Sequence, residues 1–255
     1  MARYDLSETE WRLIAPLLPN KPRGVARVDD RRVVNGIFYV LRTGSPWRDL
    51  PERYGPYTTV YNRYNRWAKA GVWLRIFETL AARSPQSLQL IDSSIIRAHQ
   101  HAAGGKKGGP DHAIGRSRGG LSTKIHAVVD EQGLPVRLLL TAGHASDKAT
   151  APTLLEGLPA SQAVIADRGY DWQNLVDLVA SRGGQAHIPT QRDRKQQRSV
   201  DRELYRQRNL IERFFNKLKH FRRIATRYDK LARNFLAAVA LASARIHLRS
   251  YESTT

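Results

Sequence analysis

The chain has 255 residues, with 42 Lys and Arg against 23 Asp and Glu, a formal net charge of +19 and no cysteine. That length suits one large domain or two small ones, and the absence of cysteine excludes disulfides and thiolate zinc sites. So large a positive excess predicts a polyanionic partner, of which nucleic acid is the usual one. No apolar run approaches the roughly 18 residues of a membrane-spanning helix and no signal peptide opens the chain, so we expect a cytoplasmic protein with no membrane partner.

Three short helices are predicted in the first 85 residues. Ser7 and Glu10 form a capping-box pattern at the start of the first, and the second is expected over residues 30–42. The third follows from four aromatic residues at helical spacing, whose stripe we expect in the core: Tyr57, Tyr61, Tyr64 and Trp67. Basic residues between them, Arg63 and Arg66, indicate a helix-turn-helix-like unit in which these two side chains contact DNA.

A change of hydrophobic period near residues 82–87 predicts a boundary, with a helical DNA-binding domain over 1–85 and a second domain over 86–255. In chain order the second domain is expected to hold a strand (88–92), a hairpin (122–130 and 134–143), a helix (147–158), a strand (162–167), a helix (171–184), a strand (185–190), a basic segment (191–200) and helices over 205–219 and 231–248. This β-β-β-α-β-α-β-α order predicts a mixed α/β sheet with flanking helices.

The segment 205–219 carries one acid, Glu212, within the most basic part of the chain. Residues 192–233 contain 15 Lys and Arg against 5 Asp and Glu, so 15 − 5 = 10 of the net positive charges lie there. On a single helical wheel, four residues share one stripe at the edge of the apolar face: Tyr205, Arg208, Glu212 and Lys219. The alternative is an ordinary amphipathic helix in which Glu212 forms an i to i+4 pair, worth about 0.2–0.5 kcal/mol.

Two further acids are expected at the ends of strands, Asp92 and Asp167. A buried acid is costly unless it is paired or bound to a metal, and ligand sites are built at strand ends of open α/β sheets. With Glu212 the two could form a three-carboxylate site for Mg²⁺ or Mn²⁺, which prefer oxygen ligands. The alternative is that each Asp caps the turn that follows it.

Three segments resemble the acidic motifs of bacterial DDE transposases of the insertion-sequence-five family: "LIDSSIIRAHQHAAG", "VIADRGYD" and "YRQRNLIERFFNKLK". The third motif of that family has Tyr, Arg, Glu and Lys at the spacing found here at Tyr205, Arg208, Glu212 and Lys219. "LSETEWRLIAPLLP" and "GSPWRDLPERYGPYTTVYNRYNRW" resemble its leading domain, so the resemblance covers nearly the whole chain.

The resemblance implies a ribonuclease-H-like fold with Asp92, Asp167 and Glu212 as the catalytic and metal-binding triad. It also implies a transposase that binds the terminal inverted repeats of its element, hydrolyses DNA at the ends and joins the freed 3′-OH to target DNA by in-line displacement. Two Mg²⁺ or Mn²⁺ ions would assist. The expected partners are double-stranded DNA, as transposon end and as target, and further copies of the chain in a dimer or larger assembly on the DNA of the bacterial nucleoid.

The resemblance further implies DNA contacts around the triad. Tyr205, Arg208 and Lys219 are expected to reach one DNA backbone, with Lys219 about 10 Å beyond Glu212 along the helix. Arg213 is expected to make diffuse contacts, and Arg168 either steadies a phosphate or pairs with an acid.

Other candidates are weaker, and two rival functions stay open. His99, His101 and His112 are expected in a mobile glycine-rich loop that contacts substrate, rather than in a zinc site. Asp147 is expected to cap a helix, and Asp130 to lie in a turn. A DNA-binding regulator without catalysis fits the charge but needs no ordered carboxylates, whereas a structure-specific nuclease needs the same triad.

Overall fold

The computed structural model describes residues 2–19, 28–103, 112–117 and 119–253. The chain divides into two compact units. Unit 1 comprises Met1–Leu80, Ala98–His112 and Leu218–Thr255, and unit 2 comprises Ala81–Arg97 and Ala113–Lys217.

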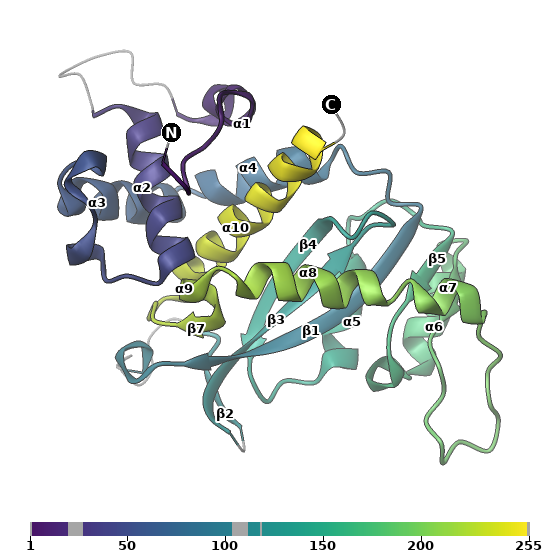
Figure 1. Cartoon of the computed structure of the whole chain (residues 1–255). Coiled ribbons are helices and arrows are strands. Elements are labelled where there is room, and N and C mark those ends of the chain that lie inside the picture. The colour runs from purple at the N-terminus through teal and green to yellow at the C-terminus, as the bar shows by residue number, and fades with distance from the viewer. Residues whose placement is uncertain (1, 20–27, 104–111, 118, 254–255) are drawn as a thin grey trace. The chain divides into compact units, whose positions relative to one another are not determined.

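Unit 1 is built from helices (Figure 1). They are α1 (Glu8–Ile14), η1 (Ala15–Leu17), α2 (Asp30–Thr43), η2 (Trp47–Asp49), η3 (Glu52–Tyr54), α3 (Tyr57–Lys69), α4 (Val72–Ala81), η4 (Gln100–Ala102), α9 (Arg222–Ala225) and α10 (Ala232–Ser253), with a short strand β7 (Thr226–Arg227). The predicted capping box is confirmed, because the Ser7 hydroxyl accepts from the Glu10 N–H and the Glu10 carboxylate accepts from the Ser7 N–H. Gly44 ends α2 with φ 76°, a left-handed conformation that favours glycine.

The C-terminal helix α10 belongs to unit 1, which differs from the expected division at residue 85. Helix α10 packs against α1, α2 and α3. Its Arg245 forms an ion pair with Glu10 of α1 at 2.7 Å, and both side chains are buried. Removing either partner of a buried ion pair leaves an uncompensated buried charge, which is strongly destabilising, so this contact helps to hold the last helix against the first.

Unit 2 is a mixed sheet with helices on its faces (Figure 1). Its strands are β1 (Leu88–Ala98), β2 (Gly115–Ser117), β3 (Gly120–Val129), β4 (Pro135–Ala142), β5 (Ala163–Ile165) and β6 (Gln185–His187), in the order β2-β3-β1-β5-β6 with β4 beside β3. β1 runs antiparallel to β3 and parallel to β5, and β5 runs parallel to β6. The predicted hairpin is confirmed as β3 and β4, closed by a turn in which the Asp130 carboxylate accepts from the N–H groups of Gln132 and Leu134.

The helices of unit 2 are α5 (Asp147–Leu155), η5 (Arg168–Tyr170), α6 (Gln173–Ser181), α7 (Arg202–Arg206) and α8 (Asn209–Lys219), the last of which ends in unit 1. One core unites Ile91 of β1 and Val128 of β3 with apolar residues of α5 and α6, so these two helices cover that face of the sheet. Because side chains alternate along a strand, Asp92 points to the other face. The start of α8 lies on that other face, since its flanking Arg208 contacts Asp92.

Two sequence predictions about these elements are wrong. β1 does not end at Asp92 but continues to Ala98, pairing residue by residue with β3 as far as Arg97 and Ser122. The segment 205–219 is not one helix, since α7 ends at Arg206 and α8 begins at Asn209. In the described part of the chain, no helix is both long and apolar enough to cross a membrane.

Candidate active site

Asp92 and Asp167 follow the same register position on two neighbouring parallel strands. Leu90 of β1 pairs with Ile165 of β5, and each acid comes two residues after its member of that pair. Parallel neighbours lie about 4.8 Å apart, so the two carboxylates leave the sheet at adjacent points. The two carboxylates therefore form a candidate site at the carboxyl end of β5, beside the middle of β1.

Asp167 also caps the turn after β5. Its Oδ1 accepts from the N–H of Gly169 at 2.8 Å, at the start of η5. Asp92 Oδ1 accepts from the N–H of Ser93 at 2.7 Å. The capping role that the sequence allowed for Asp167 is therefore present, and it orients the carboxylate through one oxygen while leaving the other oxygen for a further ligand.

Glu212 joins the two aspartates through Arg208. Glu212 lies in the first turn of α8 with its side chain 48% exposed. Arg208 donates to Glu212 Oε1, and its Nη1 lies 3.4 Å from Oδ2 of Asp92. The alternative considered from the sequence, an i to i+4 pair of Glu212 within its helix, is therefore formed between Arg208 and Glu212. The same guanidinium also contacts Asp92 on the sheet.

The electrostatics of Asp92 show that the three acids influence one another. The pKa of Asp92 is raised to about 6, chiefly by burial and also by the charges of Asp167 and Glu212, while the Ser93 N–H and Arg208 act in the opposite direction. A carboxylate near other carboxylates is held partly protonated unless a cation compensates it. Arg208 supplies one positive charge against three potential negative charges.

The acids have the donor chemistry of a divalent metal site without being assembled as one. Among the described residues, no group of three or more His, Asp and Glu side chains is arranged to hold a metal ion. Carboxylate oxygens suit Mg²⁺ and Mn²⁺, and the raised pKa of Asp92 marks a place where added positive charge is favourable. The expectation that the three acids form one ready-made cradle is therefore met only in part, because Arg208 occupies the position between Asp92 and Glu212.

A polar cluster behind Asp92 escaped the sequence analysis. Ser93 points to the opposite face of β1 and donates to Asp147 Oδ1 at 2.7 Å. Lys124 Nζ lies 2.9 Å from the same oxygen, and the buried ring of His126 lies 3.7 Å from it. The prediction that Asp147 caps a helix is wrong, since Asp147 is the first residue of α5 and its carboxylate turns to the sheet. The alternation of Lys124 and His126 along β3 was the available signal.

The residues expected to bind DNA fall into two groups. The expectation that Arg63 contacts DNA is corrected by the structure. Its side chain is 6% exposed and forms an ion pair with Asp30 inside unit 1. It also stacks on Trp67, with its Cζ 5.1 Å from the ring centroid. The others are accessible on their own units: Arg66, Arg168, Arg213 and Lys219 are exposed, and Tyr205 is half-buried.

The aromatic stripe of α3 is partly core and partly surface. Tyr64 and Trp67 are buried, as expected. Tyr57 and Tyr61 are 38% and 40% exposed. The expectation of a wholly internal stripe therefore holds for its second half.

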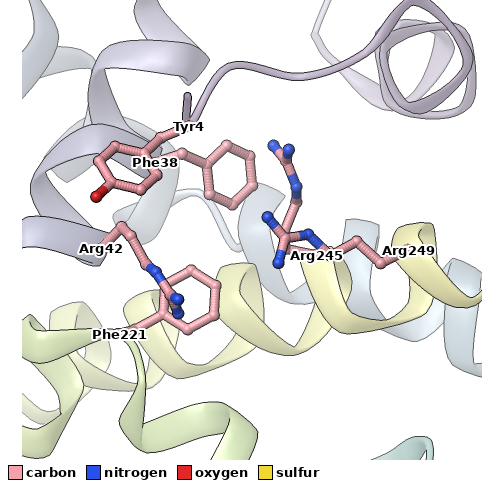
Figure 2. Close-up of a pocket in the computed structure, with 6 residues that line it drawn as sticks. All are labelled: Tyr4, Phe38, Arg42, Phe221, Arg245 and Arg249. Atoms are coloured by element: carbon pink, nitrogen blue, oxygen red, sulfur yellow. The ribbon is translucent and has the colours of Figure 1, made fainter. Parts of the chain in front are cut away.

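A cluster of three arginines in unit 1 has a structural explanation. Figure 2 shows Arg42, Arg245 and Arg249 around a small hollow with Phe38 and Phe221. Arg245 stacks on Phe38 at 5.1 Å and Arg42 on Phe221 at 5.4 Å, measured from Cζ to the ring centroid. Burial lowers the pKa of both arginines. The hollow has a volume of about 10 Å³, which is room for one water at most.

Among the described residues, His99, His101 and His112 are not part of any group arranged to hold a metal ion. His99 and His101 lie edge to face with ring centroids 4.5 Å apart, and His99 Nδ1 accepts from the His101 N–H. The glycine-rich loop in which substrate contact was expected, residues 104–111, lies outside the described residues.

Comparison with known proteins supports one family. The family model "Transposase DDE domain" matches residues 83–246, and the family model "Putative transposase of IS4/5 family" matches residues 6–77. The chain is 45% identical over 130 residues to the "Putative transposase for insertion sequence element IS6501" of Brucella ovis, which covers 51% of this chain and 100% of that protein. It is 40% identical over 112 residues to the "Insertion element IS402 uncharacterized 16.2 kDa protein" of Burkholderia cepacia, covering 38% of this chain and 76% of that protein.

A solved structure shows the same fold. A piggyBac transposase, in a synaptic complex with hairpin DNA, superposes with a TM-score of 0.51 at 9% identity, covering 96% of this chain and 71% of that chain. With the mixed sheet of unit 2, this similarity shows a ribonuclease-H-like fold. The chain belongs to the DDE transposases of the IS4/5 type, enzymes of DNA cleavage and transfer.

Proposed function

We propose that the chain binds the terminal inverted repeats of an insertion sequence, hydrolyses a phosphodiester bond at each end and joins the freed 3′-OH to target DNA. The observation that carries the proposal is the position of Asp92 and Asp167 at matched points on adjacent strands, with Glu212 coupled to Asp92 through Arg208. All three acids belong to unit 2, although 120 residues separate the first from the last (212 − 92).

The three carboxylates would hold the catalytic metal, two Mg²⁺ or Mn²⁺ ions per site. When bound, the ions supply a water of lowered pKa and stabilise the charge on the leaving 3′ oxygen. The side chains of the chain itself orient the DNA. Arg208 would move from the carboxylates to a phosphate, since arginine forms paired hydrogen bonds with either group.

The two chemical steps use one site in succession. In the first, water attacks the phosphorus at the element end, and the bond to the 3′ oxygen breaks to leave a 3′-OH on the element. In the second, that 3′-OH attacks a phosphodiester of target DNA and displaces the target's 3′ oxygen. Neither step needs a covalent bond between protein and DNA, and coordinated cutting of two ends would engage at least two copies of the chain.

A strand-transfer assay tests the proposal. Oligonucleotides that carry a pre-cut element end with a free 3′-OH are mixed with plasmid, protein and Mg²⁺, and joined products are resolved by electrophoresis. We expect joined product that requires the 3′-OH and disappears when it is replaced by 3′-H. Cleavage of uncut ends without any joined product would leave a structure-specific nuclease, and binding without either product would leave a DNA-binding regulator.

A further inference from the structure

An arginine-lined pocket lies beside the turn that carries Asp167. Its volume is about 400 Å³, within the range of sites for small ligands. Four arginines and one tyrosine line it, together with uncharged residues and no acid: Arg168, Arg198, Arg202, Arg206 and Tyr205. All belong to unit 2. Four guanidinium groups around one hollow repel one another, and an anion in the hollow would remove that repulsion.

One buried acid, Asp171, fixes a wall of this pocket. The side chain of Asp171 is 0% exposed. Its Oδ2 accepts from the N–H of Gln191 and from Arg194 Nε, each at 2.9 Å, and its Oδ1 accepts from Arg198. Burial would raise the pKa of Asp171, but the hydrogen bonds from Gln191 and Arg198 hold it below its usual value. The carboxylate therefore anchors the basic segment 191–198 as a charged group.

The anchored segment is a preformed loop. The side chain of Gln197 donates to the backbone carbonyls of Gln191 at 3.1 Å and Arg194 at 2.8 Å, and its Oε1 accepts from the Thr190 hydroxyl. These bonds close the loop on itself. A loop ordered before it binds loses less conformational entropy when a ligand arrives.

The anchor leaves unsatisfied positive charge in the pocket. Asp171 offsets part of the charge of Arg194 and Arg198. No ion pair with an acid of the described residues is found for the other three lining arginines, Arg168, Arg202 and Arg206. Their guanidinium groups are free to form the paired hydrogen bonds that phosphate accepts.

The pocket is tied to the catalytic acids by one short turn. η5 begins with Asp167 as its cap and ends at Tyr170, directly before Asp171, and Arg168 of this turn lines the pocket. Five residues thus carry a catalytic acid, a pocket arginine and the anchor of the pocket wall. Because Arg168 follows Asp167 directly in the chain, the pocket adjoins the turn that carries this acid.

We propose that this pocket binds a phosphate group of the DNA strand next to the active site, and that Asp171 is the positioning residue that builds it. The inference rests on the proposed function for the identity of the polymer. The ligand is a phosphate ester, either an internal phosphodiester or a terminal 5′-phosphate.

The test compares the DNA affinity of two variants that carry the same change in net charge. Asp171→Asn and Asp177→Asn each raise the net charge from +19 to +20. Asp177 is exposed on α6, where its carboxylate accepts only from Gln173 among the contacts described. Electrostatic attraction alone would make both variants bind DNA slightly more tightly. We expect Asp171→Asn to weaken binding of a fluorescent element-end duplex about tenfold, and its log Kd against log salt slope to fall by about 1–2, since each lost phosphate contact removes about 0.9. Equal affinity and equal slope for the two variants would overturn the inference.

Two further experiments accompany this test. The first uses a variant that keeps the Asp171 contacts, and the second distinguishes an internal phosphodiester from a terminal 5′-phosphate. Arg206→Ala changes an exposed residue that is not among the described hydrogen-bond partners of Asp171, so it tests the pocket without removing a bond of the anchor. We expect it to weaken binding and to reduce the salt slope by about 1; an unchanged slope would contradict the proposal. Competition by matched short oligonucleotides with 5′-phosphate or 5′-hydroxyl ends, against the wild type and Arg206→Ala, identifies the ligand. Preference for the phosphorylated end that is lost in Arg206→Ala indicates a terminal phosphate, and equal competition that weakens in Arg206→Ala indicates an internal phosphodiester.

The failure of this inference is distinguishable from the failure of the proposed function. If the wild type cuts and joins DNA while Asp171→Asn binds like Asp177→Asn, the pocket assignment falls and the function stands. If the wild type binds ends with the expected dependence on Asp171 but never cuts them, the proposed function falls and the pocket stands.

Discussion

Nη1 of Arg208 lies 3.4 Å from Oδ2 of Asp92, and the same guanidinium donates to Glu212. One side chain thus bridges two candidate catalytic acids, Asp92 on the sheet and Glu212 on a helix. The bridge offsets repulsion among the acids in the absence of metal. It also occupies oxygens that a divalent cation would need, so metal and Arg208 compete for them.

Arg208→Gln should therefore increase the affinity of the DNA-free protein for Mn²⁺. Removing one unit charge about 6 Å from a divalent ion is worth about 1.4 kcal/mol even at the dielectric constant of water, or about tenfold in affinity. Mn²⁺ titration followed by electron paramagnetic resonance measures it. Arg213→Gln is the matched control, because it removes the same charge from the exposed side of α8. Weaker Mn²⁺ binding in Arg208→Gln would show that the arginine organises the ligands instead of competing with the metal.

Asp92→Asn should reduce Mg²⁺-dependent nicking of an element-end duplex by about 100-fold or more, which corresponds to losing about 3 kcal/mol of transition-state stabilisation. Affinity for the duplex should change little, since the lost group is an acid. Asp177→Asn removes an exposed carboxylate of α6 and should nick at the wild-type rate. Normal nicking by Asp92→Asn would remove this residue from the triad.

His126 should make unit 2 sensitive to acid. Burial, and secondarily the charge of Lys124, lowers the pKa of His126 to about 4, below its ordinary value of 6.5. Between these values the unfolded chain binds a proton that the folded chain does not, so stability is lost as pH falls from about 6.5 to 4. Above pH 6.5 the residue is neutral in both states and imposes no penalty.

The measurement is the free energy of unfolding in urea at pH 7.5 and pH 5. The wild type should lose about 2 kcal/mol more than His126→Gln over this interval, from 1.5 pH units at 1.36 kcal/mol each. His220→Gln changes an exposed histidine and should behave like the wild type. An identical loss in His126→Gln and the wild type would show that His126 takes up its proton in the folded state.

Arg63 and Arg66 should separate stability from DNA binding. Arg63→Ala breaks a buried ion pair with Asp30 and should destabilise the protein by about 3 kcal/mol. Arg66→Ala removes an exposed cation of the same helix and should leave the melting temperature within about 2 °C, while weakening DNA binding if unit 1 contacts the ends. Thermal unfolding and anisotropy titrations check both. Loss of DNA affinity in a folded Arg63→Ala, with none in Arg66→Ala, would reverse this assignment.

The predictions from sequence succeeded where short-range chemistry decides the structure. The Ser7–Glu10 capping box and the hairpin of β3 and β4 each depend on residues close together in the chain. The triad was predicted from three motifs in a family order and stays a prediction, and the register of Leu90 with Ile165 explains why two of its members lie on neighbouring strands.

The predictions failed where distant residues decide. β1 continues past Asp92 because β3 pairs with it along its length, and the sequence after Asp92 has no signal of that partner. α10 belongs to unit 1 through contacts with α1, α2 and α3, among them the pair between Arg245 and Glu10, 235 residues apart (245 − 10). The role of Asp171 was missed because it depends on contacts with Arg194 and Arg198. These two residues lie more than 20 positions further along the chain, in a segment whose sequence resembles any solvated basic stretch.

The most direct test of the central claim is the number of Mn²⁺ ions bound per chain in the presence of element-end DNA, measured for the wild type, Asp92→Asn, Asp167→Asn, Glu212→Gln and the control Asp177→Asn. We expect two ions for the wild type and Asp177→Asn, and loss of at least one ion, or at least tenfold weaker binding, in each triad variant. If all three triad variants bind Mn²⁺ as the wild type does, Asp92, Asp167 and Glu212 do not form the metal site.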